Sequence, residues 1–360
     1  MRVLSLFDGI ATGRLALEMA GVPVDLYIAS EIDKDAKAVA RANWPDIIHI
    51  GPVENVTAPD LPKIDLVIGG SPCQGFSRAG AGLNFDDPRS RLFFDYVRVL
   101  NEVREKNPDV KFLLENVIMK REWEDVITEK LGVQPVHINS RAHSAQNRPR
   151  AYWSNIADLS PLSSGGGQPL DTIIDRSVDV SDFTEAGGLL FGPGISEGSM
   201  GLVQKTAGGI VVKQATARGY IEAVDGDGVS LAFHGSATRR GRVIHQKSHT
   251  ITCACDICVF YDNVIRHFTV EELEKLQGLP TGYTAAVPEP ARKRAIGNGW
   301  TASVIAEIFK LLPQAETAAK TDVAQSGQVC TNSAPADSVE LAGKEETHEP
   351  DNQRDPAPQL

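Results

Sequence analysis

The sequence predicts an α/β protein built on a doubly wound, mostly parallel sheet, with a second, smaller domain that is mostly β and irregular. In the N-terminal part of the chain, short apolar runs alternate with segments of helical period, as they do in βαβ units. Gly-rich and turn-rich sequence follows, and helical periodicity then returns. These changes predict one domain formed by residues 1–157 and 263–312, a second at 158–262, and a tail at 313–360.

Each element is expected from its own stretch of sequence. Strands of a parallel sheet are buried on both faces, so they read as continuous apolar runs. Such runs occupy residues 3–7, 26–30, 47–50, 66–68, 111–116, 136–139 and 151–154. Helical spacing is found between them at 15–20, 34–43, 91–104 and 122–130, and it returns at 269–277 and 302–312. Thr269 and Glu272 form a capping box at the start of the first returning helix.

Composition indicates a water-soluble protein with reduced thiols. The chain has 360 residues, 42% of them hydrophobic, which is enough to bury a sizeable core. No apolar run approaches the length of a membrane span, and the N-terminus leads directly into a strand without a signal peptide. Five cysteines scattered through a chain of this length do not make a disulfide framework. We therefore expect a cytoplasmic protein, monomeric and without a membrane partner.

Charge is distributed unevenly along the chain. The net charge is −11, but residues 313–360 hold nine acidic and three basic side chains and so supply −6 of it. That segment has few large apolar residues and is expected to be disordered. Residues 200–250 hold seven basic and three acidic side chains, a local excess of +4. A basic patch is therefore expected there, and a solvated loop region without a partner is the alternative.

The ends of the first two predicted strands indicate a nucleotide site. The loop FDGIATG, residues 7–13, has two glycines that let the backbone approach a ligand, and it leads into a helix. Glu31 ends the second strand, 22 residues after Gly9, where a carboxylate accepts hydrogen bonds from ribose hydroxyls. A nicotinamide cofactor is less expected because the three-glycine fingerprint is incomplete. A tight turn with a surface acid is the structural alternative.

A thiol and a carboxyl group lie at the carboxyl ends of two further predicted strands. Cys73 follows the strand at 66–68 in a Pro-, Gly- and Ser-rich loop, where packing is a poor reason for a cysteine. Glu115 lies at the end of the strand at 111–116. Carboxyl ends of neighbouring parallel strands open on one crevice, so a nucleophile and an acid could face one substrate there. This pairing suits addition to an aromatic ring.

These motifs together resemble the DNA (cytosine carbon-5) methyltransferases over residues 4–312. The sequences of these motifs are similar to those of the animal de novo enzymes and of phage and bacterial relatives. The matching segments are LFDGIATG at 6–13, Glu31, PCQ at 72–74, RLF at 91–93, ENV at 115–117, QNRPR at 146–150, LQGLP at 276–280 and GNGW at 297–300. The resemblance implies a Rossmann-like, S-adenosylmethionine-dependent methyltransferase fold in which residues 158–262 form a target-recognition domain.

The resemblance also implies roles for individual residues. Catalytic roles fall on Cys73, Glu115, Gln146, Arg148 and Arg150. S-adenosylmethionine would be bound by Phe7, Asp8, Gly9, Ile10, Ala11, Thr12, Glu31, Ile32, Pro52, Val53, Ser71, Arg91, Leu92, Asn298, Gly299 and Trp300. Double-stranded DNA would be contacted by Gln74, Ser77, Arg239, Arg240, Arg242 and Thr250. The implied chemistry adds the Cys73 thiolate to carbon 6 of a flipped-out cytosine, with Glu115 at ring nitrogen 3, before carbon 5 takes the methyl group.

One motif departs from the family. Pro52 stands where the family usually has an aspartate that binds the adenine amino group, and proline cannot make that contact. A modified donor, such as a carboxylated S-adenosylmethionine, is therefore an alternative to the ordinary one.

Three further alternatives remain open at this stage. One branch of the family methylates transfer RNA, although the Cys-Phe-Thr segment typical of that branch is absent. A regulatory homologue without catalysis is disfavoured by the presence of Cys73, Glu115 and Arg148. No metal is expected, because Cys253 and Cys255 have the spacing of one strand face and no second Cys-x-x-Cys pair accompanies Cys258. Structural zinc at this cluster is the alternative.

Overall fold

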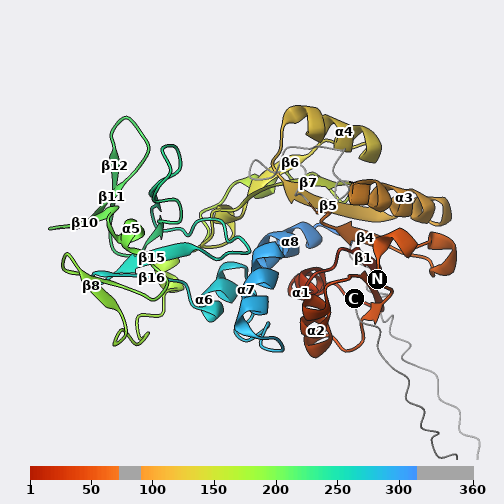
Figure 1. Ribbon diagram of the computed structural model, residues 1–360. Helices are drawn as coiled ribbons and strands as arrows, with labels where there is room; N and C mark the ends of the chain where they lie inside the picture. Colours follow the sequence, from red (N-terminus) through yellow and green to blue (C-terminus); the bar gives the residue numbers. More distant parts are fainter. Residues whose placement is uncertain (73–90, 314–360) are drawn as a thin grey trace, which may run out of the picture. The chain divides into compact units, whose positions relative to one another are not determined.

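A seven-stranded sheet forms the larger part of the computed structural model, which describes residues 1–72 and 91–313 (Figure 1). The strand order is β3-β2-β1-β4-β5-β7-β6, and only β7 runs antiparallel to its neighbours within this sheet. The strands are β1 (Arg2–Leu6), β2 (Leu26–Ser30), β3 (Ile48–His49), β4 (Leu66–Gly69), β5 (Lys111–Val117), β6 (Val136–Asn139) and β7 (Pro149–Ser154). The predicted doubly wound α/β class is confirmed.

Helices cover both faces of this sheet. They are α1 (Thr12–Met19), α2 (Lys34–Asn43), α3 (Arg91–Lys106), α4 (Arg121–Leu131) and α8 (Ala302–Phe309). Successive strand residues enter different cores: Leu113 packs with α1 and α8, whereas Phe112 and Leu114 pack with α3 and α4. Burial on both faces explains why these strands read as continuous apolar runs.

Two smaller sheets are formed by the part of the chain between β7 and α6. One contains β10 (Val203–Thr206), β11 (Gly209–Lys213) and β12 (Tyr220–Ala223) in that order. The other has the order β14-β13-β15-β16-β9-β8, with β8 (Thr184–Ala186), β9 (Leu189–Phe191), β13 (Asp227–Ser230), β14 (Arg242–Ile244), β15 (Ile257–Tyr261) and β16 (Val264–His267). Strand β16 lies beyond the predicted boundary at residue 262 and still pairs within this sheet. The short helix α5 (Glu197–Met200) precedes β10.

Two further helices join the six-stranded sheet to α8. Helix α6 (Val270–Leu276) begins with the predicted capping box of Thr269 and Glu272. Glu272 also forms a buried ion pair with Arg266 of β16, at 2.7 Å, which fixes α6 to the sheet. Helix α7 (Glu289–Asn298) was not predicted, since few of its residues are buried.

Short 3-10 turns complete the described chain. They are η1 (Val53–Asn55), η2 (Ala58–Asp60), η4 (Ser140–Ala142), η5 (Ser160–Ser163) and η6 (Leu170–Thr172). Of the helices in the described ranges, none is both long and apolar enough to cross a membrane.

The cysteine segment differs from the expectation. Residues 253–256 form a turn and a loop rather than a strand, and Cys255 has the left-handed φ of 48°. Cys253 is exposed, while Cys255 and Cys258 are buried as free thiols. Among the described residues, no group of three or more His, Cys, Asp or Glu side chains is placed to hold a metal ion.

Candidate active site

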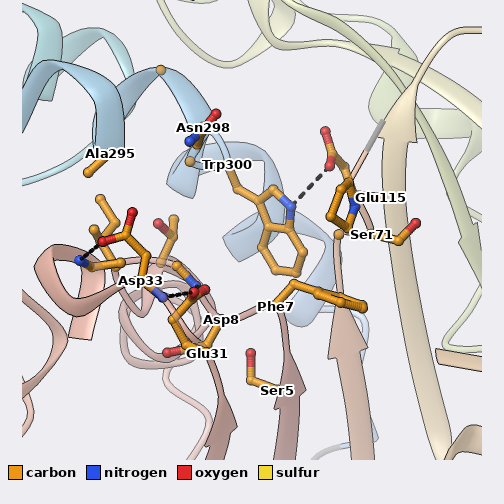
Figure 2. Close-up of a pocket in the computed structure, with 18 of the residues that line it drawn as sticks. Ser5, Phe7, Asp8, Glu31, Asp33, Ser71, Glu115, Ala295, Asn298 and Trp300 are labelled. Carbon is orange, nitrogen blue, oxygen red and sulfur yellow. Dashed lines mark hydrogen bonds between the residues drawn. The ribbon is translucent and has the colours of Figure 1, made fainter. Parts of the chain in front are cut away.

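A cavity of about 320 Å³ opens at the carboxyl ends of β1, β2, β4 and β5 (Figure 2). Its lining comes from the loop at 7–13, from Glu31, from residues 70–72 after β4, from residues 115–117 at the end of β5, and from residues 294–300. Arg148 and Arg150 complete the wall near Glu115. The carboxyl edge of a doubly wound sheet is where such folds bind ligands, so this cavity is the candidate active site.

The loop at 7–13 has an unusual backbone. Phe7, Gly9 and Ala11 have left-handed φ values of 59°, 61° and 59°. Such values are unfavourable for residues with a side chain, so the surrounding structure must hold Phe7 and Ala11 in place. Gly13 has a packing role instead, because a Cβ there would collide with the Ile68 side chain. The two glycines of the motif therefore serve different purposes.

Glu31 is one of the groups that hold the loop. Its Oε2 accepts a hydrogen bond from the backbone N–H of Gly9 at 2.8 Å. Its Oε1 accepts from the N–H groups of Ile32 and Asp33, each at 2.7 Å. A carboxylate offers about four acceptor sites, so capacity remains for a ribose hydroxyl.

Asp8 is a buried carboxyl group on the same loop. Its Oδ1 accepts a hydrogen bond from the Tyr27 hydroxyl at 2.8 Å. Burial raises the pKa of Asp8 to about 7, and nearby Glu31 adds to the rise, while the hydroxyls of Ser5 and Tyr27 oppose it. Asp8 therefore changes its charge near neutral pH, within the lining of the cavity.

Asp8→Asn tests this carboxyl group through the pH dependence of folding. Because the folded-state pKa lies above the ordinary value, Asp8 contributes stability that is present at acid pH and is lost as pH rises through about 7. Between about pH 5 and pH 8, the wild-type protein should lose roughly 2–3 kcal/mol of unfolding free energy relative to the variant. Urea titrations of both proteins measure this. A difference in unfolding free energy between the two proteins that stays constant over this pH range would contradict the prediction.

Glu115 is held from two sides at the end of β5. Its Oε1 pairs with Nε of Arg150 at 2.9 Å, and its Oε2 accepts a hydrogen bond from the indole N–H of Trp300 at 3.1 Å. Figure 2 shows the second contact across the cavity. A Cβ at Gly70 would lie 2.8 Å from Nε1 of Trp300 and 3.2 Å from Oε2 of Glu115. The glycine is therefore needed for this arrangement.

Arg148 and Gln146 connect distant segments of the chain. The buried Arg148 guanidinium donates to the carbonyl groups of Ile251 at 2.7 Å and Gly299 at 3.0 Å. Gln146 accepts from the backbone N–H of Ile251 at 3.1 Å and donates to Oε1 of Gln277 at 2.9 Å. Arg148 lines the cavity, whereas Gln146 is fully buried behind it. A direct catalytic role for Gln146 stays a prediction.

The structure brings most of the predicted cofactor residues to the cavity. Those in its lining are Phe7, Asp8, Gly9, Ile10, Thr12, Glu31, Ser71, Asn298, Gly299 and Trp300. Those outside it are Ala11, Ile32, Pro52, Val53, Arg91 and Leu92. Ala11 and Val53 point into the hydrophobic core, and Ile32 is 72% exposed. Contact of these six with a donor stays a prediction.

Some predicted residues cannot be placed and others lie elsewhere. Cys73, Gln74 and Ser77 lie outside the described residues. The predicted DNA-contacting residues that are described lie outside the cavity, and they are Arg239, Arg240, Arg242 and Thr250. Among them, Arg239 stacks on the exposed ring of Phe233 at 4.4 Å, and the Thr250 hydroxyl donates to the Asn147 carbonyl at 2.7 Å.

Sequence reasoning missed three charged residues of the lining. Arg294 of α7 lies 2.6 Å from Asp35 and 3.7 Å from Asp33, and all three side chains line the cavity. Asp33 also caps α2, because its side chain accepts the N–H groups of Asp35 and Ala36. Asp33 could have been predicted from its position just before a helical segment. No local sequence pattern indicates that Arg294 reaches the cavity.

The sheet order and the cavity at its carboxyl edge define the Rossmann-like methyltransferase fold class. Solved structures of methyltransferases have a similar fold. Methyltransferase EhMeth of Entamoeba histolytica matches with a TM-score of 0.60 at 13% identity, over 86% of this chain and 97% of that one. Dnmt2 methyltransferase of S. pombe matches with a TM-score of 0.56 at 17% identity, over 87% and 98%.

Sequence comparisons match parts of the chain to known proteins. Residues 1–127 match the model of the C-5 cytosine-specific DNA methylases. Type II methyltransferase M1.ScrFI of Lactococcus lactis subsp. cremoris is 33% identical over 205 residues, which are 50% of this chain and 51% of that protein. Orphan methyltransferase M.SPRI of Bacillus phage SPR is 44% identical over 119 residues, 32% and 26% respectively. The chain thus spans about half or less of these relatives.

Proposed function

We propose that this protein transfers the methyl group of S-adenosylmethionine to carbon 5 of a cytosine in double-stranded DNA. The observation that carries the proposal is that Glu115, fixed by Arg150 and Trp300, faces the same cavity as the loop at 7–13 and Glu31. A carboxyl group for the base and a nucleotide loop for the donor therefore share one site. The family match over residues 1–127 supports this assignment.

The residues of the cavity fit the donor. Its volume of about 320 Å³ suits part of a nucleoside-sized ligand in an open site. The first loop presents backbone at the start of α1, and Glu31 retains acceptor capacity for a ribose hydroxyl. The carboxyl group of Asp8 lies in the same wall, where it favours a cationic ligand once ionised. When bound, S-adenosylmethionine supplies an electrophilic methyl group.

The chemistry on the base falls to the protein's own side chains. The Cys73 thiolate adds to carbon 6 of the cytosine, while Glu115 holds a proton at ring nitrogen 3, and the pair of electrons released makes carbon 5 nucleophilic. After carbon 5 has taken the methyl group, a base removes its proton. The carbon–sulfur bond then breaks and the thiolate leaves. Arg150 fixes the direction of the Glu115 carboxyl group during these steps.

A cytosine stacked in a duplex cannot present carbon 5 and carbon 6 to a cavity of this kind, so the base must be flipped out. The smaller sheets supply the DNA-contacting surface in this proposal. Basic side chains of β14 and of the segment just before it, Arg239, Arg240 and Arg242, meet phosphates or base edges, and Thr250 lies next to the Gln146–Arg150 segment.

Tritium transfer tests the function. The full chain is incubated with methyl-labelled S-adenosylmethionine and unmethylated genomic DNA of mixed sequence, with transfer RNA present as competitor. We expect label in DNA, recovered after nuclease digestion as 5-methyldeoxycytidine. Preferential labelling of RNA would contradict the DNA substrate, and labelled DNA without 5-methyldeoxycytidine would contradict the reaction.

A further inference from the structure

We propose that Tyr283 is a positioning residue for the loop at 7–13 and that it acts through its hydrogen bond to the Ile10 carbonyl. This inference rests on the proposed function, in which that loop binds the methyl donor. Tyr283 is not in the lining of the cavity and would not touch the donor. Its effect on donor binding would be exerted through the backbone of the loop.

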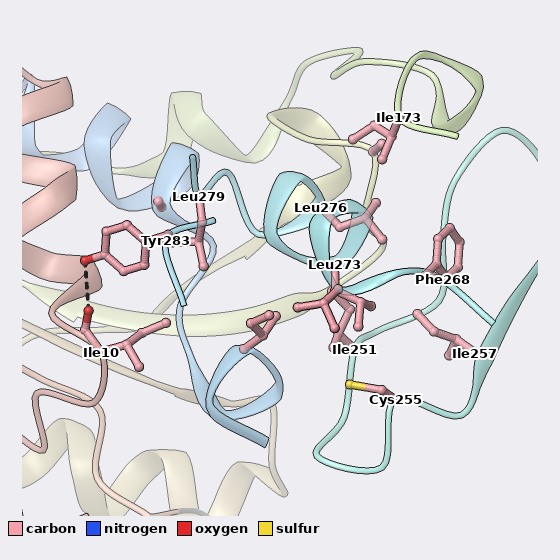
Figure 3. Packing of buried hydrophobic residues seen from close by; sticks show 14 of the residues in the cluster. Ile10, Ile173, Ile251, Cys255, Ile257, Phe268, Leu273, Leu276, Leu279 and Tyr283 are labelled. Atoms are coloured by element: carbon pink, nitrogen blue, oxygen red, sulfur yellow. Dashed lines mark hydrogen bonds between the residues drawn. The ribbon is translucent and has the colours of Figure 1, made fainter. Parts of the chain in front are cut away.

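The Tyr283 hydroxyl lies at a junction of three segments. It donates a hydrogen bond to the Ile10 carbonyl at 2.8 Å, and Figure 3 shows this bond at the edge of the buried cluster. The hydroxyl oxygen accepts the indole N–H of Trp44 at 3.1 Å. Tyr283 itself is only 5% exposed. Because the bond is shielded from water, a carbonyl left without its donor there would be unfavourable.

The loop needs such restraint. Ile10 stands between Gly9 and Ala11, both of which have left-handed φ values, and Ala11 carries a side chain. A conformation of this kind persists only where contacts hold it. Glu31 holds the loop at the Gly9 N–H, and Tyr283 holds it one residue later at the Ile10 carbonyl. Together these two bonds fix the peptide groups that face the donor.

Tyr283 is itself rigidly held. The buried carboxylate of Glu274 in α6 accepts the N–H of Gly282 at 2.6 Å and that of Thr284 at 2.8 Å. The amide of Asn43 donates to the Tyr283 carbonyl at 2.9 Å. The turn on both sides of Tyr283 is therefore clamped, so its hydroxyl presents a fixed point to the loop rather than following it.

Tyr283→Phe removes the hydroxyl and keeps the ring, so the fold should be retained. Binding of S-adenosylhomocysteine to the full chain, measured by calorimetry, should weaken about three- to tenfold, as expected for one lost buried hydrogen bond. In the methyl-transfer assay, KM for the donor should rise by a similar factor while kcat stays within about twofold. This split separates positioning of the donor loop from a general loss of folded protein.

Two variants serve as controls. Tyr96→Phe removes a buried hydroxyl that donates to the Leu113 carbonyl at 3.2 Å rather than to the loop at 7–13, and this variant should keep donor affinity. Trp44→Phe removes the donor to the Tyr283 hydroxyl but leaves the bond to Ile10, and should also keep it.

The outcomes separate the two proposals. Tyr283→Phe binding within twofold of wild type would overturn the inference, as would an equal loss in Tyr96→Phe or in Trp44→Phe. A fall in kcat with unchanged KM would also overturn it. If the wild-type chain binds no S-adenosylhomocysteine at all, the proposed function fails first, and the role of Tyr283 fails with it.

Discussion

DNA in which 5-fluorodeoxycytidine replaces every cytosine will trap the wild-type protein in a complex that survives boiling in detergent, and Cys73→Ser will form none. Fluorine cannot leave carbon 5 as a proton does, so elimination of the thiol is blocked after methyl transfer. An alcohol is a far weaker nucleophile near neutral pH than a partly ionised thiol, so the serine variant cannot make the bond to carbon 6. Full replacement of cytosine makes the experiment independent of the target sequence.

The chain offers a matched control for this experiment. Cys253 is an exposed free thiol whose Sγ donates to Oδ1 of Asn298 at 2.9 Å. Cys253→Ser makes the same chemical change at a second accessible thiol and should leave trapping intact. DNA binding by both variants, measured without donor, shows that each still reaches the substrate. A donor-dependent covalent complex formed by Cys73→Ser, or loss of trapping in Cys253→Ser alone, would mean that another residue is the nucleophile.

The strands of the large sheet were predictable because their signal is local. Burial on both faces makes each strand a continuous apolar run, and β1, β2, β4 and β5 all read that way. Helix α7 was hard to predict because, unlike these strands, it buries few of its residues. Only Ala291, Ile296 and Gly297 of it are buried, so no apolar stripe marks it in the sequence. It is nevertheless the helix that carries Arg294 into the cavity.

The candidate site was predictable as a set of motifs but not as a set of contacts. The motif at 146–150 predicts a catalytic role for three polar side chains. In the structure, each of the three contacts different residues. Arg150 pairs with Glu115, Arg148 bonds to carbonyl groups 103 and 151 residues away, and Gln146 bonds to Gln277. Contacts across such sequence separations depend on the packing of the whole chain, which a motif does not contain.

Glu115→Gln should lower the rate of methyl transfer, and of trapping on the fluorinated DNA, by about 10²–10⁴-fold, the usual contribution of a positioned acid or base. The substitution preserves the size of the side chain and keeps an oxygen for the Trp300 indole N–H, but it removes both the acidic proton and the ion pair with Arg150. Stabilisation of the cytosine adduct at ring nitrogen 3 is lost as a result. Single-turnover kinetics with saturating DNA and donor measure this step directly.

Glu124→Gln is the matched control for this substitution. Glu124 is a buried glutamate of α4 that contacts His137 at 3.1 Å, outside the cavity at the end of β5. The Glu124→Gln variant should have a lower free energy of unfolding without a comparable loss of the methyl-transfer rate. Affinity for S-adenosylhomocysteine should be nearly unchanged in Glu115→Gln, because the carboxyl group acts on the base rather than on the donor. A Glu115→Gln rate within tenfold of wild type would leave the fixed carboxyl group with a structural role only, and the acid would have to be sought among the other groups that line the cavity.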